Sequence, residues 1–232
     1  MWNCKDLRNQ VKLLLEHYQE LSITEEDDHR ILLSGTILVY RSACDFILQK
    51  QYDVNIVVPK ADNALPMAID TGDSIASTYP HRYTNGSLCL ETDSYIRYRF
   101  IDGMNLVEWM DEFVEPYFFS YEFYCRFGSF PFGERPHGLE GLIHTYQEFW
   151  HEKDPITTCG LLRYAAEETY RGHVLCPCNS GKKLRQCHGP AILPYMRDKR
   201  HLEILQSDFQ YLRKELTEYE QSKPNNTKTK RS

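Results

Sequence analysis

Residues 31–58 read ILLSGTILVYRSACDFILQKQYDVNIVV and contain two runs rich in apolar and β-branched side chains. The first run extends from Ile31 to Tyr40. The second extends from Asp45 to Val58, and it alternates as a half-buried strand does, with apolar side chains at Phe46, Leu48, Val54, Ile56 and Val58. A third short strand is expected from Pro66 to Ile69. Because turn residues separate these runs, the pattern predicts an antiparallel meander.

The segments flanking the meander have weaker patterns. An amphipathic helix is expected up to about Glu20, since apolar residues recur at helical spacing at Leu7, Val11, Leu14, Leu15, Tyr18 and Leu21. The acidic and polar run Ser22 to His29 is expected to be a connecting loop. Gly72 to Thr92 has little periodicity, which favours an ordered but irregular segment, and Arg97 to Phe100 is expected to be a further strand.

Helices are expected in the second half of the chain. Asn105 followed by Glu108 has the spacing of a capping box, and the helix it opens places one apolar side at Leu106, Trp109, Met110, Phe113 and Val114. Leu139 to Trp150 and Leu161 to Tyr170 are expected to be two further helices. A meander followed by helices predicts an α+β fold.

A long final helix is predicted from about Tyr195 to Gln221. Its apolar residues follow alternating three- and four-residue steps, at Leu202, Leu205, Phe209, Leu212, Leu216 and Tyr219. This spacing suits the seam of a coiled coil, and therefore a homodimer, but it covers fewer than three heptads. The alternative is a helix docked on its own domain. The polar and basic residues 223–232 are expected to form a disordered tail.

The segment from Cys176 to Gly189 reads CPCNSGKKLRQCHG and offers three thiols and an imidazole within a few residues. Cys176, Cys178, Cys187 and His188 form the ligand set of a tetrahedral structural zinc site, which has no open position for catalysis. The stretch resembles the SEC-C motif, first noted at the C-terminus of the SecA translocation motor. Asn179 stands where that motif has Gly, and Asn is the next-best residue for a left-handed backbone.

Charge and composition limit the partners and the cellular compartment that we expect for this protein. The formal net charge of −6 argues against a nucleic-acid-binding surface, so no specific nucleic-acid partner is expected. No apolar run approaches the length of a membrane-spanning helix, and the first residues lack the apolar stretch of a signal peptide. We therefore expect a cytoplasmic protein, in which clustered cysteines indicate metal binding rather than disulfides.

The segment from Tyr79 to Leu90 reads YPHRYTNGSLCL. Together with the preceding meander it resembles ubiquitin-conjugating enzymes, which carry a His-Pro-Asn turn, then a Gly, then a Cys followed by Leu. The resemblance covers about Leu7 to Trp150. It is closer to the bacterial branch of that family, as is the later run PFGERPHG at residues 131–138. It implies a ubiquitin-conjugating-type fold and a cysteine transferase with a thioester intermediate on Cys89.

The chemistry of a thiol suits that role, since a thiolate attacks an activated carboxyl and later leaves in favour of an amine. The sequence departs from the family where Arg82 and Tyr83 follow His81, so the usual Asn that supports the oxyanion is missing. His81 is the first candidate to replace it, and Asn85 and Tyr83 are the others. His137 is a weaker candidate for a general base.

These interpretations give three segments: a ubiquitin-conjugating-like catalytic domain (1–155), a helix with the zinc motif and the final helix (156–222), and the tail (223–232). Bacterial relatives of this kind occur in CBASS-type antiphage operons. The resemblance therefore implies that Cys89 receives the C-terminal tail of a cGAS-like nucleotidyltransferase and passes it to an amine. The rival interpretation is an inactive conjugating-type adaptor that binds partners through the zinc motif and the final helix.

Overall fold

The computed structural model describes residues 6–62 and 64–222. The chain forms an α+β structure that divides into two compact units, Met1–Arg135 and Pro136–Ser232. The sequence placed its first boundary further along the chain, after residue 155. The helix α5 (Gly138–Trp150) instead packs on α6 (Pro155–Glu167), α7 (Gly189–Arg197) and α8 (Lys199–Ser222), so it belongs with the second unit. Each unit is described by itself below.

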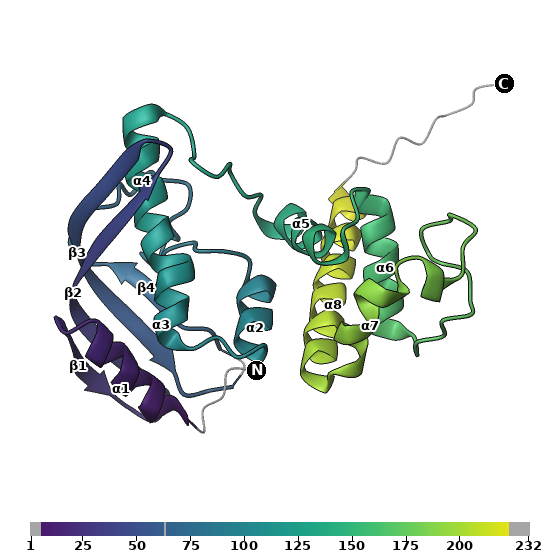
Figure 1. Cartoon of the computed structure of the whole chain (residues 1–232), viewed down its shortest axis with the longest axis horizontal. Coiled ribbons are helices and arrows are strands. Elements are labelled where there is room, and N and C mark those ends of the chain that lie inside the picture. Colours follow the sequence, from purple (N-terminus) through teal and green to yellow (C-terminus); the bar gives the residue numbers. More distant parts are fainter. Residues whose placement is uncertain (1–5, 63, 223–232) are drawn as a thin grey trace. The chain divides into compact units, whose positions relative to one another are not determined.

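The first unit is built on a four-stranded antiparallel sheet in the order β1-β2-β3-β4 (Figure 1). The strands β2 (Arg30–Ala43) and β3 (Phe46–Pro59) pair along their whole length, from Arg30 opposite Pro59 to Ala43 opposite Phe46. They are joined by Cys44 and Asp45, whose φ angles of 51° and 58° are those of a tight two-residue hairpin turn. The predicted meander is therefore confirmed, with β4 (Met67–Asp70) as its last strand.

Two expectations for this unit were wrong. Ser22 to Glu26 is not a loop but most of β1 (Leu21–Glu26), an edge strand on β2 in which only Leu21 is buried. The strand shows no apolar alternation because its other side chains face solvent. Arg97 to Phe100 is not a strand but lies in α2 (Asp93–Ile101), whose aromatic and β-branched residues imitate a strand in so short a window. The first helix, α1 (Leu7–His17), also ends earlier than predicted.

One long helical segment packs on the sheet. It begins with α3 (Leu106–Trp109), passes through the π-helical turn η2 (Met110–Val114) and continues as α4 (Glu115–Phe127), which contacts β2 and β3. The capping box is confirmed, since the Asn105 side chain accepts from the Val107 and Glu108 amides at 2.8 and 3.0 Å. The π turn ends at Val114, two residues before Pro116, whose ring would clash with a carbonyl one turn earlier in a regular α-helix.

The core of the first unit lies between the sheet and this helical segment. Tyr52 of β3 stacks on Phe118 of α4 with ring centroids 4.1 Å apart, and both rings are buried. Gly35 in β2 allows the chain before β1 to approach closely, because a Cβ at this position would lie 2.0 Å from the Glu20 carbonyl oxygen. The predicted apolar side of the helix is buried as expected, at Leu106, Trp109, Met110, Phe113 and Val114.

The second unit is helical, with the Cys/His segment between α6 and α7. The helix α6 starts earlier than predicted because Asp154 caps it, accepting from the Thr157 amide at 2.8 Å. The final helix is not continuous from Tyr195. It is broken at Asp198, whose carboxylate accepts from the Arg200 amide at 2.8 Å and so begins α8. The short 3-10 turn η3 (Leu184–Gln186) precedes α7.

The residues 223–232, for which a disordered tail was predicted, lie outside the described residues. No helix in the described ranges is both long enough and apolar enough to cross a membrane.

Candidate cysteine and zinc sites

Cys89 stands at the end of a tight hairpin that begins at His81. The Cys89 amide donates to the His81 carbonyl at 2.8 Å, the Tyr83 amide donates to the Ser87 carbonyl at 2.9 Å, and Gly86 turns the chain at a φ of +85°. The returning arm lies against the edge of the sheet, since the Leu88 amide donates to the Ala68 carbonyl in β4 at 2.9 Å. The apparently irregular segment thus fixes Cys89 to the sheet.

The Cys89 side chain is half-buried in a cleft of about 270 Å³. Apolar groups form much of its wall, among them Leu90, Phe113, Pro116, Phe130 and Phe132. Phe132 is 69% exposed, so this part of the apolar wall faces solvent. The cleft thus presents apolar side chains beside the sulfur, and one of them faces solvent.

His81 lies beside Cys89 in the same cleft. The Sγ atom and a ring nitrogen of His81 are within 4.8 Å of each other. The His81 Nε2 is 3.5 Å from the Glu134 carboxylate, and the His81 and Phe130 rings are nearly perpendicular with their centroids 5.2 Å apart. Glu134 was not foreseen as a site residue. Its only signal in the sequence was its place in the run of residues 131–138.

The other two predicted site residues, Tyr83 and Asn85, differ in whether they contact Cys89. The Tyr83 hydroxyl is hydrogen-bonded to the Cys89 thiol. Asn85 shapes the turn, because its Oδ1 accepts from the Ser87 amide at 3.0 Å and from the Ser87 hydroxyl at 2.7 Å. The structure therefore brings Cys89, His81 and Tyr83 together, while Asn85 bonds within the turn. His137 is the N-cap residue of α5 and belongs to the second unit.

Burial raises the pKa of the Cys89 thiol above its ordinary range. The hydrogen bond from Tyr83 opposes this shift, whereas the carboxylates of Glu91 and Asp93 add to it. The resting thiol is therefore mostly protonated at neutral pH. A nucleophilic role for this thiol would require a change at the site that favours the thiolate, such as a nearby positive charge or a proton acceptor.

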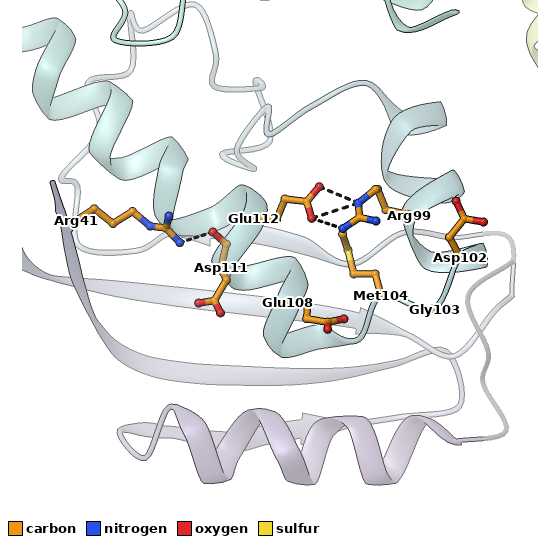
Figure 2. A pocket seen from close by; sticks show the side chains of 8 residues that line it. All are labelled: Arg41, Arg99, Asp102, Gly103, Met104, Glu108, Asp111 and Glu112. Carbon is orange, nitrogen blue, oxygen red and sulfur yellow. Dashed lines mark hydrogen bonds and ion pairs between the residues drawn. The ribbon is translucent and has the colours of Figure 1, made fainter. Parts of the chain in front are cut away.

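A second hollow of the first unit is more polar, and charged side chains that line it contact one another (Figure 2). The Arg99 guanidinium binds both Glu112 carboxylate oxygens, with its shortest contact at 2.6 Å. Arg41 donates to the Asp111 carbonyl and to the Glu115 carboxylate. Both arginines of the hollow are thus engaged within the protein.

In the second unit, the predicted zinc ligands converge. Single donor atoms of Cys176, Cys178, Cys187 and His188 all lie within 4.8 Å of one another. The turn that gathers them needs left-handed backbone at Asn179 and Gly181, with φ angles of 58° and 74°. Asn at position 179 therefore satisfies the conformation for which the motif ordinarily uses Gly.

The donor set fits zinc. The Cys178 and Cys187 sulfurs are 3.5 Å apart, and the His188 Nδ1 is 3.3 Å from the Cys176 sulfur and 3.4 Å from the Cys187 sulfur. Burial opposes ionisation of Cys178, but its hydrogen bonds with Ser180 and with the thiols of Cys176 and Cys187 lower its pKa to about 6. Three sulfurs and one imidazole nitrogen would complete a tetrahedral shell, leaving no open position for catalysis.

Comparison with protein families identifies a SEC-C motif at residues 175–190, the stretch that contains all four converging residues. The comparisons with curated proteins and with solved structures found no match. The motif supports zinc binding by the second unit.

Proposed function

We propose that this protein is a ubiquitin-conjugating-like cysteine transferase, which takes a protein C-terminus as a thioester on Cys89 and passes it to an amine. The observation that carries the proposal is the placement of Cys89 in an open, partly apolar cleft beside His81 and Tyr83. The helix, four-stranded antiparallel sheet and following helices are consistent with the ubiquitin-conjugating-type fold that the resemblance implies.

Two acyl transfers make up the reaction. First, the Cys89 thiolate attacks the carbonyl carbon of an incoming thioester. A C–S bond to Cys89 forms, the C–S bond to the carrier breaks, and the carrier leaves as a thiol after taking up a proton. An amine then attacks the Cys89 thioester, a C–N bond forms, the C–S bond breaks, and the proton lost by the nitrogen returns to sulfur. Neither transfer requires a nucleotide.

His81 would support the oxyanion that forms on the carbonyl oxygen when the carbonyl carbon is attacked in each step, because a nitrogen of its ring lies within 4.8 Å of the sulfur. Tyr83 would be a second donor, since its hydroxyl is hydrogen-bonded to the Cys89 thiol. We assign Asn85 a role in shaping the turn, because its side-chain oxygen Oδ1 already accepts hydrogen bonds from the Ser87 amide and hydroxyl. Glu134, at 3.5 Å from His81, would hold the ring in place.

The partner follows from the resemblance. We propose that the carboxyl group comes from the C-terminal tail of a cGAS-like nucleotidyltransferase in bacterial antiphage defence, with the chain acting in the cytoplasm. The zinc would be structural.

One observation favours the adaptor alternative. Because burial raises the pKa of Cys89, the free protein holds a thiol that is poorly activated. An adaptor with this fold would bind the same tail in the cleft without forming a covalent bond.

A fluorescent peptide carrying a C-terminal thioester tests the transferase without any activating enzyme. Mixed with the full chain, it should give a labelled band on gels that is lost on adding thiol. Cys89→Ala should abolish this band, and Cys89→Ser should give a thiol-resistant oxyester or none. Cys125→Ala is the matched control, since Cys125 is exposed. Labelling that persists in Cys89→Ala would refute the assignment, and binding without labelling would favour the adaptor.

A further inference from the structure

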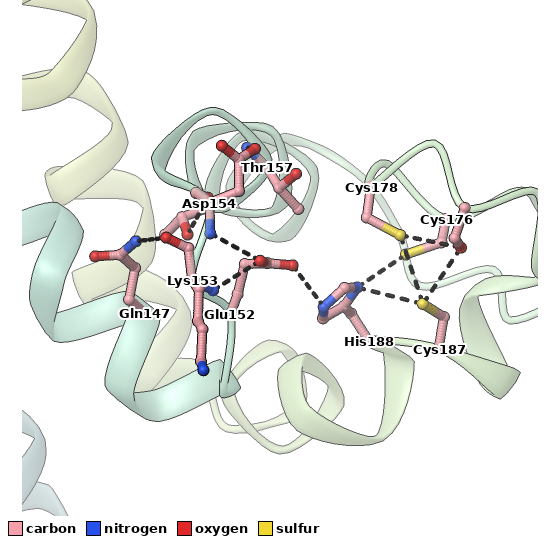
Figure 3. Close-up of polar contacts among 11 residues, drawn as sticks. Gln147, Glu152, Lys153, Asp154, Thr157, Cys176, Cys178, Cys187 and His188 are labelled. Carbon is pink, nitrogen blue, oxygen red and sulfur yellow. Dashed lines mark hydrogen bonds and ion pairs between the residues drawn. The ribbon is translucent and has the colours of Figure 1, made fainter.

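Glu152 contacts the zinc cluster from outside the SEC-C motif. It lies in the connection between α5 and α6, and its Oε2 is 3.0 Å from the His188 Nε2 (Figure 3). Both side chains are only 16% exposed. The matched residues begin at 175, so nothing in the motif specifies this carboxylate.

The Glu152 carboxylate is itself held rigidly. Its Oε1 accepts from the amides of Lys153 and Asp154 at 2.7 and 2.9 Å. The same loop is fixed on both sides, since Gln147 of α5 donates to the Lys153 carbonyl at 2.6 Å and Asp154 caps α6. One oxygen of the carboxylate thus binds backbone amides while the other is directed at the imidazole.

The two nitrogens of His188 therefore face opposite partners. The Nδ1 points toward the sulfurs of Cys176 and Cys187, and the Nε2 points toward Glu152. A carboxylate accepts hydrogen bonds and cannot donate one, so it selects the tautomer with hydrogen on Nε2 and a lone pair on Nδ1. Only that lone pair can bind a metal among the three sulfurs.

We propose that Glu152 is a positioning residue for the metal. It fixes the tautomer and the orientation of His188, and it thereby joins the metal site to the α5–α6 connection. On this proposal, zinc binding orders the helical body of the second unit as well as the short Cys/His segment. Removal of such a partner typically weakens metal binding about 10- to 100-fold.

Glu152→Gln is the sharpest variant because it keeps the size of the side chain. The Gln carbonyl oxygen would still accept from the backbone amides, which leaves its NH2 group facing His188. That group donates, so it favours hydrogen on Nδ1, the wrong tautomer for binding. Zinc affinity, measured on the full chain by competition with a chromophoric chelator, should fall about 10- to 100-fold. The zinc affinity of Glu152→Ala should fall by a similar factor.

A matched control lies four residues earlier in the sequence. Glu148 also pairs with a histidine, His144, at 3.8 Å, but both side chains are about 40% exposed and neither residue belongs to the Cys/His cluster. Glu148→Gln should leave zinc affinity within about twofold, because an exposed pair of this kind contributes little.

Nitrogen NMR of the His188 ring gives a second readout that a purely structural role would not move. In the zinc-bound wild-type chain, Nδ1 should show the shift of a metal-bound nitrogen, and Nε2 should carry the hydrogen. Unchanged affinity in Glu152→Gln, a metal-bound Nε2, or wild-type protein that binds no zinc would each overturn the proposal. If Glu152→Ala fails to fold, the zinc affinity of the isosteric Glu152→Gln variant tests the proposal by itself.

Discussion

The amide of Cys89 donates to the carbonyl of His81 at 2.8 Å, so the two residues are paired backbone to backbone across a hairpin. Their side chains therefore enter one cleft from neighbouring arms, although seven residues separate them in the sequence. The relative position of thiol and imidazole is consequently set by the turn at Asn85 and Gly86. A substitution that distorts this turn should therefore disturb the arrangement of the thiol and the imidazole.

Gly86→Ala should impair thioester formation by Cys89. A side chain at a φ of +85° strains the backbone by about 1–2 kcal/mol, while the space around the new Cβ is adequate, with no atom nearer than 3.7 Å. The measurement is the rate of labelling by the peptide thioester, together with the melting temperature. Gly128→Ala is the control, since Gly128 has a φ of +69° at the end of α4, away from the turn. Equal labelling in both variants would contradict this view of the turn.

The reactivity of Cys89 toward iodoacetamide should continue to rise at pH values above the ordinary thiol range. The raised pKa means that the thiolate forms later than in an ordinary thiol as pH increases. Tyr83→Phe removes a hydrogen bond that lowers the pKa, so the midpoint should move further up. Mass spectrometry of the alkylated peptides gives the rate at each pH, with the exposed Cys44 as an internal reference. A rate that levels off below pH 8 would be inconsistent with a buried, unactivated thiol.

His81→Ala should slow transfer from the Cys89 thioester to an amine by about 100- to 1000-fold if the ring supports the oxyanion. The preformed peptide thioester is isolated and its loss to free lysine is followed on gels. His29→Ala serves as the control, because His29 is exposed at the β1–β2 turn of the same unit. A transfer rate within twofold of wild type would remove His81 from the mechanism.

Much of the fold could be predicted because its signals are local. The β2–β3 hairpin alternates strongly, and the Asn105–Glu108 capping box depends only on residues three apart. The edge strand β1 and the helix α2 could not be read in this way. An edge strand is defined by pairing with β2, a contact with a distant segment, and α2 is too short for periodicity to separate it from a strand.

The candidate sites likewise contain some residues that local sequence spacing predicts and others that only the fold brings together. The four predicted zinc ligands lie within thirteen residues, so their local spacing was enough to predict that they form one cluster. Glu152 and Glu134 reach their histidines through the fold, from a loop between helices and from the segment after α4. An isolated glutamate has no motif, and sequence spacing does not reveal what it contacts.

The final helix should behave as a docked helix rather than as a dimer seam. Leu205 and Leu212 are buried within the second unit, whereas Leu216 is 45% exposed. Leu205→Ala should therefore cost about 2–5 kcal/mol of unfolding free energy, and Leu216→Ala should change it by less than about 0.5 kcal/mol. Denaturant unfolding measures both, and light scattering should report a monomer. A dimer that Leu216→Asp dissociates would restore the coiled-coil interpretation.

Removing the metal should unfold the second unit and leave the first unit intact. The ligand His188 directly precedes α7, and Leu184 and Ile192 on either side of it are fully buried, so the metal site is continuous with the helical core. Structural zinc supplies about 10–16 kcal/mol of apparent binding free energy in small motifs, which is comparable to the whole unfolding free energy of a typical domain, about 5–15 kcal/mol. Elemental analysis should find about one zinc per chain. Cys176→Ser, or a strong chelator, should speed hydrogen exchange in residues 138–197 while residues 30–59 keep their protection. Unchanged exchange in 138–197 would show that the helices fold without the metal, and loss of protection in 30–59 would show that the two units unfold as one.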